Sequence, residues 1–218
     1  MDGAESQTGS GRSAGGDGRK GGALVDWDWW TVDFGDAHAG AAGVLIGGDE
    51  PGPVYFDVGS GSDVPSTTHW SAYDGRHRRP RAEAVRAVCA CGWRSPAQYP
   101  LDWDTIGDQP LCEADVDLTG PLADWTAHLS VVRDAAVPLP EPLAALLVEV
   151  AEQLTATAAD TPLVALRAAG VLERIAAMVG RAAAGSLHDD GMSAEALATA
   201  LGTTSSKALV LLLTAQDG

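Results

Sequence analysis

The chain of 218 residues is 45% hydrophobic and 20% charged, a composition typical of one or two globular domains and not of a disordered protein. A net charge of −16 argues against non-specific binding to phosphate, which requires a positive surface. Three cysteines without a secretory signal favour a reducing cytoplasm over a disulfide framework, and no run reaches the roughly 18 apolar residues of a membrane span.

The composition changes twice along the chain. Residues 1–22 are rich in Gly and Ser, so we expect a disordered tail there. Residues 23–136 contain short alternating and apolar runs typical of strands, whereas residues 137–218 follow a helical period. The sequence thus predicts an α+β protein: a small antiparallel β-rich N-terminal domain followed by an all-α helical bundle.

Several strands are expected in the β-rich domain. Large apolar and acidic residues alternate over 23–34, residues 41–48 form a short buried run, and residues 53–59 form a strand bounded by turn residues. Residues 69–73 and 84–91 are predicted to pair as a hairpin, with Asp74-Gly75 opening its turn.

The connection within this hairpin carries most of the basic character. Residues 23–75 hold nine acids and no Lys or Arg, whereas residues 76–94 hold six arginines. The local field of a cluster within 76–81 favours a phosphate, a nucleic acid or an acidic protein surface. It is equally consistent with neutralising the acidic segments on either side. The cluster, named the arginine loop, consists of Arg76, Arg78, Arg79 and Arg81.

A Cys-x-Cys-Gly-Trp motif follows on the return strand. Cys89 and Cys91 are two residues apart, so on a strand both sulfurs share a face, and His128 lies on a helix-like segment downstream. These three side chains could bind zinc, with His69, His77 or Cys112 as the fourth ligand. Alternatively, the two cysteines are small buried hydrophobes and His128 makes a local hydrogen bond. No residue pattern marks a nucleophile or an oxyanion site, so we expect neither catalysis nor a small-molecule substrate.

The remainder of the chain has a helical period. An apolar stripe runs from Leu143 to Leu154 after a proline-rich linker. Thr161 and Pro162 mark the start of the next helix as cap and first turn, and Gly185 marks its end. Together with the two helices that follow, these segments are predicted to form a compact four-helix bundle.

The last two helices, expected over 193–201 and 204–213, have the spacing of a helix-turn-helix. Gly202 is expected to end the first helix in the left-handed conformation, and Ser193 and Thr203 or Thr204 to cap the two helices. Leu197, Leu201, Ala208 and Leu211 would form the buried inner face. The positions that would face a DNA groove are Thr204, Ser205, Ser206 and Lys207.

With these residues in view, the chain resembles a group of actinomycete proteins that couple a Cys-x-Cys-Gly-Trp ribbon-like module to a C-terminal helix-turn-helix-like region. The matching segments are 88–94, 99–103, Trp125-x-x-His128, 161–169 with 172–174, and Ala198-x-x-x-Gly202. The resemblance implies a regulatory or mobile-element setting. A typical DNA-reading second helix would carry Arg or Gln where this chain has Ser and Leu.

Two functions follow as hypotheses. The first is a cytoplasmic DNA-binding regulatory or accessory protein, in which the tip of the last helix faces the groove and the arginine loop contacts phosphate. The second is a non-catalytic adaptor, in which the apolar face over 209–213 binds a protein partner or a second copy. In both, the tip of the last helix is expected to stay exposed.

Overall fold

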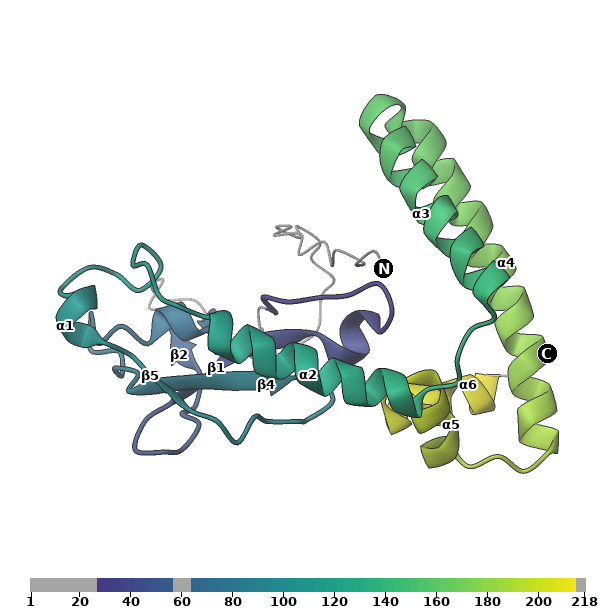
Figure 1. Ribbon diagram of the computed structural model, residues 1–218. Coiled ribbons are helices and arrows are strands. Elements are labelled where there is room, and N and C mark those ends of the chain that lie inside the picture. The colour runs from purple at the N-terminus through teal and green to yellow at the C-terminus, as the bar shows by residue number, and fades with distance from the viewer. Residues whose placement is uncertain (1–26, 57–63, 215–218) are drawn as a thin grey trace, which may run out of the picture. The chain divides into compact units, whose positions relative to one another are not determined.

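A computed structural model describes residues 27–56 and 64–214 (Figure 1). The chain divides into two compact units, Met1–Val131 and Val132–Gly218. A small antiparallel sheet region precedes a helical part, which confirms the α+β class. The expected tail over 1–22, the start of the strand predicted over 23–34 and the end of the one predicted over 53–59 lie outside the described residues.

The first unit contains the strands, the short helices and most of α2, whose last four residues belong to the second unit. In chain order its elements are η1 (Gly35–His38), β1 (Gly40–Leu45), β2 (Val54–Tyr55), β3 (Ser66–Thr67), η2 (Trp70–Ala72), β4 (Ala84–Cys89), β5 (Tyr99–Pro100), α1 (Trp103–Ile106) and α2 (Thr119–Ala135). The second unit contains α3 (Glu141–Asp160), α4 (Pro162–Asp189), α5 (Ala194–Leu201) and α6 (Ser205–Thr214).

The main sheet has the strand order β1-β4-β5 with antiparallel pairing, and β2 pairs with β3 in a second, two-stranded sheet. The partner of β4 is therefore β1, in a register that pairs Gly40 with Cys89 and Leu45 with Ala84. The predicted hairpin of 69–73 with 84–91 is wrong. Only Asp74 and Arg81 form a bridge where that hairpin was expected.

The segment 69–73 forms the short helix η2 instead of a strand. Ala72 and Tyr73 are both buried in one apolar cluster with Val44 and Val54, whereas a strand would turn successive side chains to opposite faces. The Tyr73 hydroxyl donates a hydrogen bond to the carbonyl of Gly52 over 2.8 Å. Burial of two consecutive side chains thus outweighs the aromatic strand preference of this segment.

Helix α2 packs on the sheet through Trp125 and Leu129, one turn apart, which form a buried cluster with Ala87 and Cys89 of β4 (Figure 1). The indole of Trp125 lies against Gly40, where a Cβ atom would overlap the ring. The indole N–H also donates to the carbonyl of His38 over 3.0 Å. The glycine therefore sets how closely α2 approaches the sheet.

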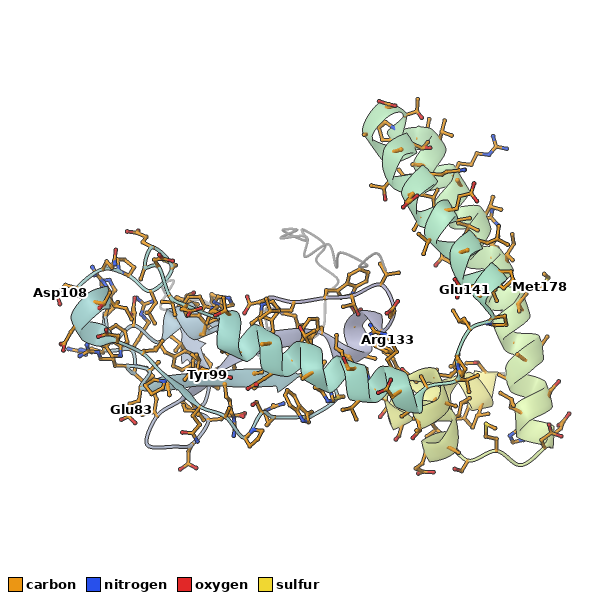
Figure 2. All side chains as sticks on the ribbon, in the orientation of Figure 1. Glu83, Tyr99, Asp108, Arg133, Glu141 and Met178 are labelled. Atoms are coloured by element: carbon orange, nitrogen blue, oxygen red, sulfur yellow. The ribbon has the colours of Figure 1, made fainter. Side chains whose placement is uncertain are left out.

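In the second unit, α3 and α4 form a hairpin with an unusually exposed surface (Figure 2). None of the residues of α3 is buried, and α4 buries only Ala165 and Ala184. The predicted compact four-helix bundle is thus wrong in this respect, because α3 packs mainly on α4 and most of both helices stays exposed, while α6 also packs against α4. Pro162 lies in the first turn of α4 as expected, but the Thr161 side chain makes no cap and α4 continues past Gly185 to Asp189.

The pair α5–α6 has the predicted elbow. Gly202 is left-handed, with φ 57° and ψ 47°, and Ser193 caps α5 by accepting from the amide of Ala196. The buried residues are Leu197, Ala198, Ala208 and Leu212. Leu201 and Leu211 are exposed, contrary to prediction, because the step of four from Ala208 leads to Leu212 on the inner face.

Among the described residues, no single helix has the length and apolar character needed to cross a membrane. The α5–α6 pair together meets the criterion of length and composition, with a bend of 111° between its helices.

Candidate metal centre

Four potential metal ligands converge in the first unit. The ligand atoms of His38, Cys89, Cys91 and His128 all lie within 4.8 Å of one another. His38 and Cys89 are buried, whereas Cys91 and His128 lie closer to the surface. This group confirms that the two cysteines and His128 come together in space, and it is able to hold a metal ion.

Strand pairing places the two residues at the buried side of the group. Cys89 is the last residue of β4, and His38 ends η1 two residues before β1. Because Gly40 is paired with Cys89, the His38 ring comes within reach of the cysteine, with 3.6 Å between Nδ1 and Sγ. The amide of Ala90 donates to the carbonyl of Ala39 over 2.8 Å and extends this contact beyond the strand.

A tight turn returns Cys91 to the same side as Cys89. Gly92 has φ 97°, a conformation that favours glycine, and its amide donates to the carbonyl of Cys89 over 2.9 Å. The amide of Cys89 in turn donates to the carbonyl of Trp93 over 2.9 Å. The sequence Cys-x-Cys-Gly-Trp is thus a turn with two sulfurs on one side.

Helix α2 supplies the fourth side chain. Trp125 and Leu129 hold this helix on the sheet, and His128 lies between them in sequence. Its Nε2 is 3.4 Å from the sulfur of Cys91. Trp93 stacks on the imidazole of His128, with ring centroids 4.3 Å apart and only 4° between the planes. The stacked indole restricts rotation of the ring and keeps Nε2 directed at the sulfur.

The environment of the cysteines favours a thiolate. A hydrogen bond with Cys89 lowers the pKa of Cys91 to about 4, outweighing the opposing effect of burial. The amide of Trp93, 3.5 Å from the sulfur, and the ring of His128 contribute to the same lowering of this pKa. The same thiol pair, together with burial, raises the pKa of Cys89 far above its usual range. Metal binding would displace the remaining thiol proton.

The spacing of the group matches tetrahedral coordination. Metal–sulfur and metal–nitrogen bonds of the usual zinc lengths place adjacent sulfur and nitrogen ligands roughly 3.6 Å apart. The sulfur–nitrogen separations here are 3.6 Å for Cys89 with His38 and 3.4 Å for Cys91 with His128. Both sulfur–nitrogen pairs are therefore compatible with binding to one tetrahedral ion.

The other three candidate ligands lie elsewhere. His69 caps η2, its Nδ1 lies 2.8 Å from the hydroxyl of Ser71, and its Nε2 lies 2.9 Å from the carboxylate of Asp28. His77 and Cys112 are exposed and are not part of the group. The fourth ligand predicted from the sequence is thus replaced by His38. Its one local signal is its position just before the buried run that became β1.

The arginine loop is largely engaged within its own unit. Arg76 donates to the carbonyl of Asp108, and Arg79 forms a 2.9 Å ion pair with Asp74. The guanidinium of Arg81 lies 4.1 Å from the ring centroid of Trp103. Arg78 is exposed with φ 64°. These contacts correspond to the intramolecular interpretation, and a phosphate contact by the loop stays a prediction.

The tip of α6 is at the surface. Ser205, Ser206 and Lys207 are exposed, while the hydroxyl of Thr204 caps the helix by accepting from the amide of Lys207 over 3.3 Å. Beside the tip is an open, mainly apolar groove of about 510 Å³. Its lining consists of Leu201, Thr203, Ser206, Lys207, Val210 and Leu211.

No protein-family model, curated protein or solved structure matches the chain.

Proposed function

We propose that this protein is a non-catalytic zinc-binding protein, in which His38, Cys89, Cys91 and His128 hold one structural Zn²⁺. The observation that carries the proposal is the convergence of four ligand atoms within 4.8 Å, from three separate segments of the chain. The ion would fasten η1 and α2 to the end of β4.

The donor set favours zinc among the common ions. Two sulfurs and two imidazole nitrogens suit a borderline-soft ion in tetrahedral geometry, whereas Mg²⁺ and Ca²⁺ prefer oxygen ligands. Two thiolates and one divalent ion also have no net charge. A neutral centre is compatible with a site of which two ligands are buried.

A structural role is favoured over a catalytic one because four protein ligands occupy all four positions of a tetrahedral zinc site. Catalytic zinc sites usually have three protein ligands and a fourth position for water or substrate. The surrounding aromatic side chains would limit access of solvent to the centre. They are Trp125, which is buried in one apolar cluster with Cys89, and Trp29, Phe34 and Trp93, which pack against that cluster.

Metal analysis of the full chain tests the proposal. We expect one zinc per chain after purification in a zinc-containing medium, and cobalt substitution should give the absorption of a tetrahedral sulfur–nitrogen site. His38→Ala and Cys91→Ser should each lose the metal. The matched controls His69→Ala and Cys112→Ser should retain it. Wild-type protein that binds neither ion, or a His69→Ala protein as depleted as His38→Ala, would show the proposal to be wrong.

A second candidate function is contact with DNA through α6, as in a regulatory or accessory protein. The supporting observation is that the elbow at Gly202 buries the inner face of α6 while Ser205, Ser206 and Lys207 stay exposed. The alternative is an adaptor that docks a protein on the apolar groove beside the same tip. The aliphatic side chains of that groove, Leu201, Val210 and Leu211, offer no hydrogen bonds to base edges and suit an apolar protein surface instead.

A mobility-shift titration of duplex DNA at low salt separates these two candidates. If α6 contacts DNA, the wild type should retain the duplex, and Lys207→Gln should weaken binding by about the same factor for every DNA sequence. The slope of log affinity against log salt concentration should also become shallower by about one unit in this variant. Arg78→Gln in the arginine loop should weaken it only if that loop contacts phosphate. No retention at micromolar protein would leave the adaptor as the candidate for α5–α6.

A further inference from the structure

The hairpin of α3 and α4 exposes an apolar surface that its own unit does not cover. Large aliphatic side chains on both helices are more than one third exposed, among them Leu146 at 58%, Val164 at 56% and Ile175 at 49%. Met178, which projects from α4 in Figure 2, is 60% exposed. Two paired helices cannot bury such stripes by themselves, because each covers only one side of the other.

These side chains gather on one face of the hairpin. An open groove of about 600 Å³ runs between the two helices, with Val150 and Leu154 on one wall and Val164 and Val171 on the other. Helical steps of three and four continue this face from Val150 to Leu146, and from Val171 to Ile175 and Met178. The apolar face is therefore contributed by both helices.

The two helices differ in charge. Helix α3 carries Glu141, Glu149, Glu152 and Asp160 and no lysine or arginine. Helix α4 carries three arginines, namely Arg167, Arg174 and Arg181, against Glu173 and Asp189. The groove itself is flanked by Gln153 and Arg167. The hairpin thus combines an acidic helix, a basic helix and an apolar face between them.

From this combination we infer that the apolar face of the hairpin binds the same face of a second copy of this chain. A twofold axis parallel to the helices places α3 of each copy beside α4 of the other. All neighbouring helices are then antiparallel, and the four form a bundle with the apolar faces inside. The alternative axis, which places α3 beside α3, would bring two acidic helices together and is disfavoured by repulsion.

One cross-copy pair identifies this arrangement. Glu149 is next to Val150, and Arg174 is one turn from Val171. Since both valines line the same groove, Glu149 and Arg174 lie at about the same height along the hairpin. The helical period places Glu149 on the side of α3 that faces away from α4, and Arg174 on the side of α4 that faces away from α3. The two side chains are therefore separated within one copy. In the proposed dimer, Glu149 of each copy lies beside the arginine of the other.

Sedimentation equilibrium of the full chain tests the inference. The wild type should be a concentration-dependent or stable dimer. Val171→Glu should raise the dimer dissociation constant by at least about 100-fold, because a charge would be buried in the bundle. The control Leu166→Glu changes a residue on the other side of α4 that is 71% exposed, and it should leave the dimer intact. Circular dichroism checks that both variants stay helical.

A charge reversal then tests the pairing of the helices. Glu149→Arg or Arg174→Glu alone should weaken the dimer by roughly tenfold, since each exposed pair is modest and occurs twice. The double variant should recover most of the wild-type affinity. A wild-type monomer at every accessible concentration overturns the dimer, as does equal weakening by Leu166→Glu. If the double variant dimerises more weakly than either single variant, the pairing of α3 with α4 of the other copy is overturned. Cys91→Ser, which removes a proposed zinc ligand, should leave association unchanged.

Discussion

Gly40 is paired with Cys89 across β1 and β4, and the indole of Trp125 from α2 covers this glycine. The pairing brings His38 to the sulfur of Cys89, and the close approach of α2 brings His128 to Cys91. Gly40 thus lies where the strand pairing that positions His38 meets the helix packing that positions His128.

Substitution of this glycine should disturb the centre without removing a ligand. Gly40→Ala places a methyl group where the Trp125 ring lies, so α2 must shift, and we expect a loss of about 1–3 kcal/mol in the free energy of unfolding. Zinc affinity should fall as well, because His128 moves with α2. Gly52→Ala is the matched control, since a Cβ there meets no atom within 4 Å. Urea denaturation and zinc competition measure the two effects, and equal behaviour of both variants would contradict this role for Gly40.

Removal of the metal should destabilise the first unit selectively. An ion present at 1,000 times its dissociation constant stabilises the folded state by about 4 kcal/mol. All seven tryptophans lie between residues 27 and 125, so their fluorescence reports on the first unit, whereas the long helices of the second dominate the helical circular dichroism. A chelator should therefore lower the fluorescence melting temperature while the helical signal at 25 °C changes little. A melting curve unaffected by chelator would count against a structural ion.

Trp93 should act as a positioning residue for His128. Its indole is stacked on the imidazole at 4.3 Å, so Trp93→Leu frees the ring to rotate and should weaken zinc binding by roughly tenfold. Trp103→Leu is the control, because that indole contacts Arg81 and the carbonyl of Ala82 instead. Competition with a chromophoric chelator gives both affinities. If the two variants bind zinc equally well, the stack has no positioning role.

Glu50 should make the stability of the first unit depend on pH. Burial raises the pKa of this carboxyl, but hydrogen bonds from Arg86 and Arg94 outweigh burial and hold the pKa below its usual value of 4.5. A lowered pKa in the folded state stabilises the protein above pH 4.5, and this contribution is lost as the pH falls below that value.

The matching variant is Glu50→Gln. Because 37% of the Glu50 side chain is exposed, the free energy of unfolding of the wild type should exceed that of this variant by at most about 1 kcal/mol at pH 7. The difference in unfolding free energy, measured in urea from pH 7 to pH 3, should shrink toward zero in acid. Glu113→Gln, at an exposed position, serves as the control. A difference that grows as the pH falls would have the wrong sign.

Local interactions made several features predictable from the sequence. The periods of α3 and α4, the elbow at Gly202 and the cap at Ser193 each depend on residues within one or two turns. The Cys-x-Cys spacing likewise predicted two sulfurs on one side of the chain. These features follow from backbone geometry and side-chain period, which neighbouring residues determine.

Tertiary structure decided which distant residues meet. His38 joins the cysteines because β4 pairs with β1, a choice between strands that no local pattern of 84–91 specifies. The same choice left 69–73 to form η2, with His69 beside Asp28 instead of at the centre. Strand partners are selected by burial and register over the whole unit, so a ligand 51 residues from Cys89 could be identified only when the chain had folded.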